Sequence, residues 1–277
     1  MRSEATSPGP AATGAYRMFV GGRFTAARSG RTYRVGGATV PLAAGEDVDD
    51  AVAAARAAFA GWSGAAAYHR GRTLYRVAEA LEARVAVFSA VGVGADELCL
   101  AVDRWVWYAG WADKVAQAYG RTHPVAGGDL TVSAPAPVGV VGAAAPADAG
   151  LLGLVGVVAP AVVVGNTVVV LAAEADPLPA LALAEVLATS DVPGGVVNIL
   201  TGRLEPTATL LGSHTGVDAL DLTGVDGPLA ARLEHLAAAR AAVVRRAPGP
   251  VDWRADPGTT AMTDLLRTRT VWHPRGT

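Results

Sequence analysis

The stretch that decides the fold is residues 135–203, which read PAPVGVVGAAAPADAGLLGLVGVVAPAVVVGNTVVVLAAEADPLPALALAEVLATSDVPGGVVNILTGR. Residues 149–173 within it carry no charge, and about 20 apolar residues are enough for a transmembrane helix. Pro160 and the adjacent Gly165 and Asn166, however, divide this run into a helix and the β-branched strand TVVVL. Such a strand is typical of a parallel sheet buried on both faces, so we expect a protein core and no membrane span.

Strand-like and helix-like segments alternate on either side of TVVVL. The strand-like segments are VGVVG, TVVVL, VVNIL, DALDL and AAVVRR. Helices are expected from Leu151, over 177–188, near Pro206 and over 227–240. This alternation predicts the α/β class, with a Rossmann-like parallel sheet that carries helices on both faces.

The N-terminal half predicts three helices and one hairpin. Gly127, Gly128 and Asp129 form a turn signal between two extended segments, which predicts a β-hairpin over 121–137. Three runs of apolar residues show helical spacing. They are Val48, Val52, Ala55 and Phe59 behind Asp47, then Leu74, Val77, Leu81, Val85 and Phe88, then Leu98, Val102, Trp105 and Val106.

Composition narrows the classes of function. The chain has 277 residues, 51% of them hydrophobic and only 17% charged, with a net charge of −2. A charged fraction below the usual ~25% favours an apolar contact surface. Lys114 is the only lysine and no basic stripe occurs, so nucleic acid is not an expected partner. A single cysteine, Cys99, and a start without the apolar core of a secretory signal predict a cytoplasmic protein without disulfides.

Four segments carry a family resemblance. Residues 18–32 read MFVGGRFTAARSGRT, residues 107–114 read WYAGWADK, and residues 262–274 read MTDLLRTRTVWHP. Together with 135–203, they resemble the aldehyde dehydrogenase family. The resemblance covers about 17–224 and 261–273, and it implies a coenzyme-binding domain, a projecting hairpin and a C-terminal strand that pairs with that hairpin.

These observations predict four regions. A Pro-, Gly-, Ala- and Ser-rich tail over 1–15 is expected to be disordered. The coenzyme-type domain is expected over 16–245, with the 121–137 hairpin projecting from it. A turn-rich linker over 246–260 then leads to a C-terminal oligomerisation strand within 261–277.

The resemblance also implies that catalytic groups have been replaced. The family's P-W-N turn, whose Asn donates a hydrogen bond to the oxyanion, corresponds to Pro146, Ala147 and Asp148. The family's nucleophilic Cys and its Glu base follow the segment around Gly224, yet no cysteine occurs after that point and Glu234 is the only glutamate there. Cys99, between two leucines, is expected to be an inert core residue. We therefore expect no catalytic residues, and Asp148 marks a degenerate oxyanion position.

The cofactor contacts are altered in the same way. Where the family has K-P-A-E to hold the adenosine ribose, this chain has Leu171 at the Lys and Glu174 at the Glu. In the phosphate segment Thr223 and Gly224 are retained, but an acidic residue, Asp226, follows, and negative charge opposes diphosphate binding. We expect no NAD(P) or weak binding, with Glu174, Thr223 and Gly224 as vestigial contacts. Gly150, Gly153 and Gly156 are expected to permit close helix packing.

The remaining groups of polar residues that could suggest catalysis or metal binding have simpler structural explanations. Ser213, His214 and Asp218 fit a helix end better than a catalytic relay. Aspartates 218, 221 and 226 lie on and after an alternating strand whose side chains point to opposite faces. The histidines are scattered without the spacing of metal ligands, so no metal site is predicted.

Three hypotheses of function follow. The first is a catalytically inactive subunit that pairs, through the 121–137 hairpin and the 265–274 strand, with an active NAD(P)-dependent aldehyde dehydrogenase, or otherwise with itself. Val132, Val271 and Trp272 are the expected interface residues. The second is an NAD(P)-dependent aldehyde oxidoreductase with an atypical site that uses Cys99. The third is a non-catalytic nucleotide-binding module.

Overall fold

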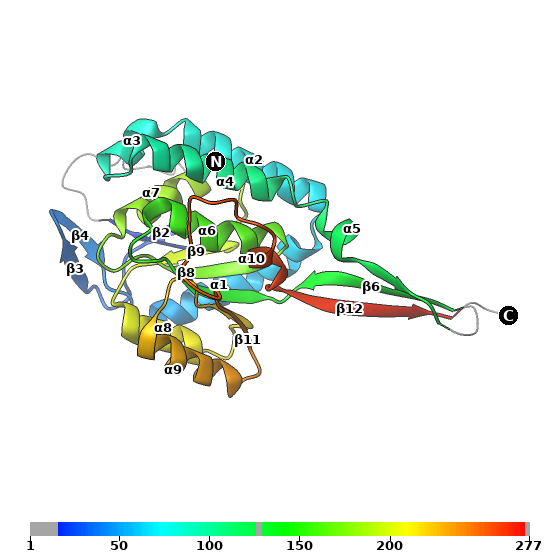
Figure 1. The fold of residues 1–277 in the computed structure, drawn as a ribbon. Coiled ribbons are helices and arrows are strands. Elements are labelled where there is room, and N and C mark those ends of the chain that lie inside the picture. The colour runs from blue at the N-terminus through cyan, green and yellow to red at the C-terminus, as the bar shows by residue number, and fades with distance from the viewer. Residues whose placement is uncertain (1–15, 126–128, 275–277) are drawn as a thin grey trace, which may run out of the picture.

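A seven-stranded sheet forms the centre of the molecule. The computed structural model describes residues 16–125 and 129–274, so the expected tail over 1–15 and the turn glycines 127 and 128 lie outside the described residues. The strand order is β11-β10-β7-β8-β9-β1-β2 (Figure 1). Its strands are β1 Met18–Val20, β2 Arg23–Thr25, β7 Val140–Ala144, β8 Thr167–Leu171, β9 Val197–Leu200, β10 Ala219–Asp221 and β11 Val243–Arg245.

The five strands from β7 onward are parallel, as the alternation predicts. Val168 lies between Val141 of β7 and Val197 of β9, and all five residues of β8 are buried. Every side chain of this strand is therefore covered by a helix, which accounts for its unbroken run of β-branched and leucine residues. The N-terminal hairpin of β1 and β2 extends the sheet antiparallel through Phe19 and Ile199.

Helices cover both faces of the sheet, which confirms the predicted fold class. One buried cluster joins the sheet to α2, α4, α6 and α7, and a second joins the opposite face to α1, α8 and α9. The remaining helices of the described chain are short. Their bounds are α1 Gly45–Gly64, α2 Ala67–Glu82, α3 Val85–Ala90, α4 Ala95–Ala109, α5 Val115–Tyr119, α6 Gly150–Val163, α7 Leu178–Leu187, α8 Leu204–Ser213, α9 Gly227–Ala238 and α10 Thr260–Thr263.

The N-terminal helices differ from the prediction in two details. The apolar run from Leu74 to Phe88 forms two helices, because the chain turns at Ala83 and Arg84 between α2 and α3, and Val85 is exposed. Asp47 lies inside the first turn of α1, where its carboxylate accepts a hydrogen bond from the backbone N–H of Ala44 at 2.8 Å. Asp47 is therefore the third residue of α1 and caps the helix by reaching back to the N-cap residue, Ala44.

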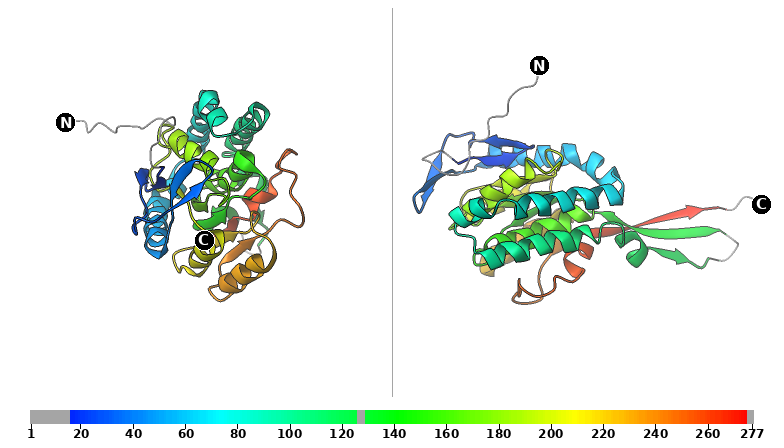
Figure 2. Two further views of the ribbon diagram at one scale, coloured as in Figure 1. Left: turned by 90° about the vertical axis from the view of Figure 1, so that its left-hand side faces the viewer. Right: turned by 90° about the horizontal axis from the view of Figure 1, so that it is seen from above.

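Two further small sheets flank the body. A ribbon of β3 Thr32–Val35 and β4 Ala38–Pro41 lies at one end. At the other end, β5 Arg121–His123, β6 Leu130–Pro137 and β12 Leu266–His273 form a three-stranded sheet in the order β12-β6-β5. Figures 1 and 2 show this sheet projecting from the body, with the described C-terminal residues at its tip. We call the three strands β5, β6 and β12 the arm.

The predicted pairing of the C-terminal strand with the hairpin is present in the structure. All eight residues of β12 lie opposite β6, from Leu266 and Pro137 at the base to His273 and Leu130 near the tip. Asn166, fully buried, fixes the base. It accepts a hydrogen bond from Gly139 N at 3.0 Å and donates one to Leu265 O at 3.0 Å. The asparagine thus links the start of β7 to the start of β12.

The segment over 246–259 packs against the body as it connects β11 to α10. Trp253 lies against Gly156 of α6, where a β-carbon would overlap the indole ring. Arg104, 7% exposed, donates from Nη2 to the carbonyl oxygens of Trp253 and Ala255 at 2.7 and 3.0 Å. The expected linker is therefore anchored by the Arg104 side chain of α4 and by the contact of Trp253 with Gly156 of α6. Gly156 therefore permits close packing of this segment on α6, whereas the prediction was close packing of helices.

Candidate functional site

The candidate site is the carboxyl edge of the sheet where the strand order reverses. The chain runs from β7 outward through β8 and β9, and then returns to β10 on the other side of β7. In open α/β sheets, ligands bind in the crevice beside such a switch point. Here the crevice is bounded by the turns after β7 and β10, which hold Asp148, Thr223 and Gly224.

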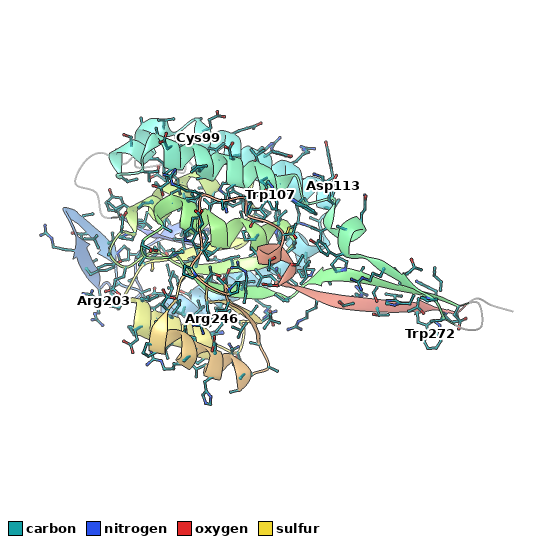
Figure 3. All side chains as sticks on the ribbon, viewed as in Figure 1. Cys99, Trp107, Asp113, Arg203, Arg246 and Trp272 are labelled. Carbon is teal, nitrogen blue, oxygen red and sulfur yellow. The ribbon has the colours of Figure 1, made fainter. Side chains whose placement is uncertain are left out.

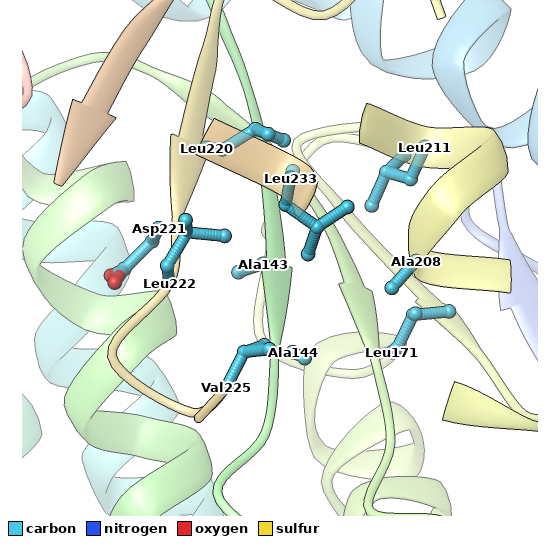
Figure 4. A pocket seen from close by; sticks show the side chains of 11 residues that line it. Ala143, Ala144, Leu171, Ala208, Leu211, Leu220, Asp221, Leu222, Val225 and Leu233 are labelled. Carbon is cyan, nitrogen blue, oxygen red and sulfur yellow. The ribbon is translucent and has the colours of Figure 1, made fainter. Parts of the chain in front are cut away.

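The space beneath this crevice is nearly filled. Between α8 and α9 remains a cavity of about 10 Å³, which is about the space one water molecule needs. Figure 4 shows leucine, valine and alanine side chains converging on it from the strands and both helices. The lining comprises Gly142, Ala143, Ala144, Leu171, Ala208, Leu211, Leu220, Asp221, Leu222, Val225 and Leu233.

Gly224 closes the mouth of the crevice. A β-carbon at Gly224 would overlap the carbonyl oxygen of Ala144, and it would lie 2.8 Å from the backbone nitrogen of Pro146. The turns after β10 and β7 are therefore in backbone contact. Glycine is needed at this position because the two turns approach so closely, which is a structural reason that involves no phosphate.

Thr223 is engaged in a buried polar cluster with Asp221 and Arg245. Asp221, fully buried at the end of β10, accepts hydrogen bonds through Oδ1 from Thr223 N at 3.0 Å and from Thr223 Oγ1 at 2.6 Å. Arg245, at the end of β11, donates from Nη1 to Asp221 Oδ2 at 2.6 Å and to Thr223 Oγ1 at 2.5 Å. The Thr223 hydroxyl is therefore engaged by Asp221 and Arg245, and these hydrogen bonds fix the turn that carries Gly224.

Glu174 is likewise committed to an internal contact. Its carboxylate accepts hydrogen bonds from Arg203 Nη1 at 2.5 Å and from Leu204 N at 2.8 Å, so it caps the first turn of α8 from the loop after β8. Partial burial would raise the pKa of Glu174, but the hydrogen bonds from Arg203 and from Leu204 N outweigh burial and lower that pKa. Leu171, at the end of β8, is buried among the apolar side chains.

A larger hollow lies at the same edge of the sheet as the crevice, and its lining includes Ala145 and Ala147 of the turn after β7. It has a volume of about 410 Å³ and lies between the ends of β7, β8 and β9 and the β3–β4 ribbon. Arg203 lies over the ring of Tyr33 with 5.6 Å between the guanidinium carbon and the ring centre. Burial raises the pKa of Tyr33, and the nearby Glu174 carboxylate raises it further. Ala145, Ala147, Ala173 and Ala175 are among the residues that line the hollow.

Asp148 lies exposed in the turn before α6. A carboxylate has no proton to donate at neutral pH, so Asp148 cannot supply the hydrogen bond that an oxyanion requires. The first turn of α6 is occupied by another acidic side chain, since Glu97 Oε1 accepts a hydrogen bond from Leu152 N at 3.2 Å. Gly150 leaves room for Glu97, because a β-carbon there would lie 2.5 Å from Oε1.

Cys99 does not have the buried position predicted for it. Leu98 is buried, but Cys99 points outward from α4 and is exposed. The neighbouring leucines suggested a core position, whereas the helix turns about 100° per residue and presents Cys99 to solvent. Figure 3 places Cys99 on the outer helical layer.

Ser213, His214 and Asp218 form no relay. His214 ends α8, accepts a hydrogen bond at Nδ1 from Gly216 N at 2.9 Å, and faces Asp49 at 3.3 Å. Asp218 instead pairs with Arg56 at 2.8 Å and accepts a hydrogen bond from Val140 N. Ser213 and His214 lie at the end of α8, as predicted, whereas Asp218 lies beyond the helix, directly before β10.

The described chain has neither a cluster of metal ligands nor a membrane-spanning helix. Over residues 16–125 and 129–274, no group of three His, Cys, Asp or Glu side chains is arranged to hold a metal ion. Within the same ranges, no helix is both long and apolar enough to cross a membrane.

The arm is the second candidate site. Val132 and Val271 lie directly opposite each other on β6 and β12, so they share one face, whereas Trp272 pairs with Thr131 on the other face. Val271 is 37% exposed and Trp272 is 67% exposed. On the face of the arm that carries Trp272, polar side chains link the three strands. Ser133 Oγ lies 2.7 Å from both His123 Nε2 and Thr270 Oγ1.

These features define a doubly wound α/β protein with a projecting three-stranded arm. The chain belongs to the aldehyde dehydrogenase family, whose family model matches residues 34–242. Cytosolic 10-formyltetrahydrofolate dehydrogenase of Mus musculus is 34% identical over 232 residues, which cover 76% of this chain and 25% of that protein. Aldehyde dehydrogenase 1A1 of Homo sapiens is 36% identical over 192 residues, 65% of this chain and 38% of that protein.

Solved structures agree with these sequence relatives. An NAD-dependent aldehyde dehydrogenase from Sinorhizobium meliloti superposes with a TM-score of 0.75 at 30% identity, over 84% of this chain and 50% of that one. The NAD⁺ complex of an aldehyde dehydrogenase from Bacillus cereus gives a TM-score of 0.77 at 27% identity, again over 84% and 50%. The chain thus spans about half the length of the solved structures that it matches, and a quarter to two fifths of these two sequence relatives.

Proposed function

We propose that this chain is a catalytically silent member of the aldehyde dehydrogenase family that assembles, through its arm, with an active NAD(P)-dependent aldehyde dehydrogenase and stabilises or regulates it. The observation that carries the proposal is the arm itself. Eight residues of β12 are held on the hairpin and kept extended outside the body, with an open edge. An exposed edge strand is a liability unless another chain pairs with it.

The contacts in the crevice support the proposal that this chain is catalytically silent. Of the three residues expected to contact the cofactor, Thr223 and Glu174 already have partners within the protein and Gly224 is in backbone contact with Ala144. The residues present do not fit a dinucleotide, because bound nucleotide would compete with all three contacts. Asp148 adds a negative charge beside the place where an oxyanion would develop. No catalytic step is therefore assigned to this chain.

Assembly is tested by coexpression with full-length aldehyde dehydrogenases of the host. We expect one of them to copurify with this chain at a fixed stoichiometry through size-exclusion chromatography. A matched control removes the exposed ring and methyl groups of the arm by the double change Val271→Ser and Trp272→Ser, which should weaken the complex while leaving the body folded. Recovery of only monomer or homodimer with every host enzyme would refute the assembly role.

A second candidate function is a nucleotide- or ligand-binding module without catalysis. The hollow of about 410 Å³ beside Tyr33, Glu174 and Arg203 favours it, since small-molecule sites commonly have volumes of ~300–1,000 Å³. Calorimetry with NAD and NADP separates the two candidates. The silent-subunit proposal predicts no heat of binding, and saturable heat with either nucleotide would favour the module.

Turnover is the remaining alternative. An oxidoreductase that uses Cys99 would show NAD(P)-dependent oxidation of aldehydes that a Cys99→Ser change abolishes. Because Cys99 lies on the outer face of α4, we expect no turnover from the purified chain.

A further inference from the structure

The turn between α8 and β10 is closed by a histidine, and we call residues 214–218 the histidine turn. His214, the C-cap residue of α8, accepts a hydrogen bond at Nδ1 from Gly216 N at 2.9 Å, and its Nε2 lies 3.3 Å from Asp49 Oδ1 of α1. These contacts assign the neutral ring with its proton on Nε2. An imidazole that is protonated on both nitrogens has no acceptor, so a second proton removes the hydrogen bond from Gly216.

The ring of His214 is packed against the turn that it closes. A β-carbon at Gly216 would lie 3.1 Å from Nδ1 of His214 and 2.8 Å from Cγ1 of Val52 in α1, so glycine is required for this close approach. The His214 side chain is only 24% exposed. A proton on Nδ1 would therefore face the Gly216 N–H across the same short distance, and the ring or the turn must move to separate the two donors.

Two arginines hold the backbone of the histidine turn. Arg56 of α1 donates from Nη2 to Gly216 O at 2.6 Å and pairs with Asp218 at 2.8 Å. Arg240, just after α9, donates from Nη1 to His214 O at 2.9 Å. The turn thus already contacts two positive charges, and a protonated imidazole would add a third beside them.

The two aspartates at the turn do not replace the lost hydrogen bond. Asp49 attracts a protonated ring, but its side chain is 70% exposed, and a pair at such a surface contributes little. Asp218 is already engaged by Arg56 and by the backbone N–H of Val140. The charges that face His214 from α1, from the end of α9 and from the turn itself therefore leave the protonated ring without a partner for Nδ1.

The histidine turn also fixes the start of β7. Asp218 Oδ2 accepts a hydrogen bond from Val140 N at 2.8 Å, and Asp218 N donates one to Val140 O at 2.9 Å. Val140 follows Gly139, whose N–H donates to Asn166 at the base of the arm. Contacts therefore continue from His214 through Asp218 and the start of β7 to the residue that anchors the arm.

We propose that the histidine turn is a pH-sensitive switch, closed while the His214 ring is neutral and opened when the ring is protonated, so that acidification loosens the link between Asp218 and Val140. The hydrogen bond from Gly216 is complete at higher pH and is lost as pH falls. Histidine is the side chain that normally changes charge between about pH 5 and 8, which sets the range for experiment. The proposal concerns the body of the molecule and does not depend on the proposed assembly role.

Hydrogen exchange followed by NMR at single residues tests the switch on the full chain. After correction for intrinsic exchange rates, protection of the Gly216 amide should fall about fivefold or more between about pH 7.5 and about pH 5.5, the effect of losing one ordinary hydrogen bond. Protection of the Asp218 and Val140 amides should fall with it. The amide of Val169, in the buried strand β8, should keep its protection. Equal protection of Gly216 at the two pH values would overturn the proposal.

A variant that keeps the acceptor but does not titrate provides the matched comparison. In His214→Asn, the side-chain Oδ1 can accept a hydrogen bond from the residue two positions later at either pH, so protection of the Gly216 amide should no longer depend on pH. His235→Asn, which removes an exposed histidine of α9, should respond to pH as wild type does. A pH response in His214→Asn equal to that of wild type would show that His214 is not the switch.

The wild-type protein alone provides a second measurement if His214→Asn does not fold. The ring nitrogen chemical shifts of His214 report its protonation directly, and they should change with the same midpoint as the protection of the Gly216 amide. Two clearly different midpoints would contradict the proposal.

Discussion

Arg245 and Arg246 are neighbours in sequence that occupy opposite electrostatic environments. Arg245 reaches the fully buried Asp221, and its own side chain is 11% exposed, whereas Arg246 pairs with Glu234 at the surface, where their side chains are 49% and 39% exposed. A buried charge that loses its partner is strongly destabilising, but a surface pair contributes little. This contrast makes the two arginines a matched pair for experiment (Figure 3 labels Arg246).

Replacing Arg245 with methionine should lower the free energy of unfolding by about 3 kcal/mol or more, because Asp221 would be left as an uncompensated buried carboxylate. Arg246→Met should change it by less than about 1 kcal/mol. Urea unfolding of the two variants measures both values. If the two losses are similar, the buried cluster does not hold the turn that carries Thr223 and Gly224.

Replacing Glu174 with glutamine should cost about 1 kcal/mol at pH 7, a typical value for loss of a helix cap. The pKa of Glu174 is lowered in the folded state. Its stabilisation is therefore complete above the pKa of an unfolded glutamate, about 4.3, and is lost as pH falls through the folded value. The difference between wild type and Glu174→Gln should shrink as pH falls from 6 to about 3 in urea titrations.

A nearby glutamate provides the control for that prediction. Glu205 pairs with Arg232 on the outer surface of α8 and its side chain is 70% exposed, so Glu205→Gln should leave stability nearly unchanged. A Glu174→Gln variant that is as stable as wild type at pH 7 would show that Glu174 is available to a ligand.

At the residue scale, the sequence reveals replacements but not their new partners. Asp148, Leu171 and Glu174 can be identified from the motif positions that they occupy. The pairing of Glu174 with Arg203 joins residues 29 positions apart on two loops that only the folded sheet brings together. Cys99 was predicted wrongly for a related reason: neighbouring leucines do not determine which face of a helix one residue occupies.

At the scale of elements, the two turns at the switch point act as one unit. Their contact through Gly224 and the apolar filling between α8 and α9 leave about 10 Å³, so the crevice is closed by packing as well as by hydrogen bonds. Tightly packed interiors resist added volume. The unit should therefore be sensitive to a single methyl group.

Gly224→Ala should destabilise the protein by about 3 kcal/mol, because the new β-carbon would overlap the Ala144 carbonyl and the backbone cannot move freely. Gly61→Ala in α1, where no atom lies within 4 Å of the added carbon, should stabilise by about 0.5–1 kcal/mol through helix propensity. Thermal and urea unfolding of the two variants should show changes of opposite sign in the free energy of unfolding. A neutral Gly224→Ala would mean that the turns are not in firm contact.

The elements themselves were largely predictable. Long periodic segments such as α1, α4 and the strand TVVVL are set by local spacing, and buried parallel strands have an evident apolar signature. The break between α2 and α3 was missed because Val85 and Phe88 continue the apolar spacing of α2, while the turn at Ala83 and Arg84 carries no Gly or Pro. The anchoring of 246–259 depends on the contact between Trp253 and Gly156. These residues lie 97 positions apart, so no local sequence pattern predicts their contact.

At the scale of the whole molecule, a body with a filled switch-point crevice carries an arm with an open strand edge. The body fills its switch-point crevice and engages its retained family residues internally, whereas the arm leaves the edge of β12, Arg267, Arg269 and Trp272 exposed. This division accounts for the proposed role, since the part of the molecule that would perform chemistry is occupied and the part that would make contacts is free. Figure 2 shows how far the arm stands away from the body.

The most direct test of this account is hydrogen exchange of the chain, alone and in complex with the coexpressed full-length aldehyde dehydrogenase. Backbone amides on an unpaired strand edge exchange readily, and pairing with another strand protects them. The account predicts that residues 266–273 become protected on assembly, while the switch-point turns over 144–150 and 222–227 remain unchanged. Protection of those turns, or of the outer surfaces of α8 and α9, with β12 unchanged would contradict it.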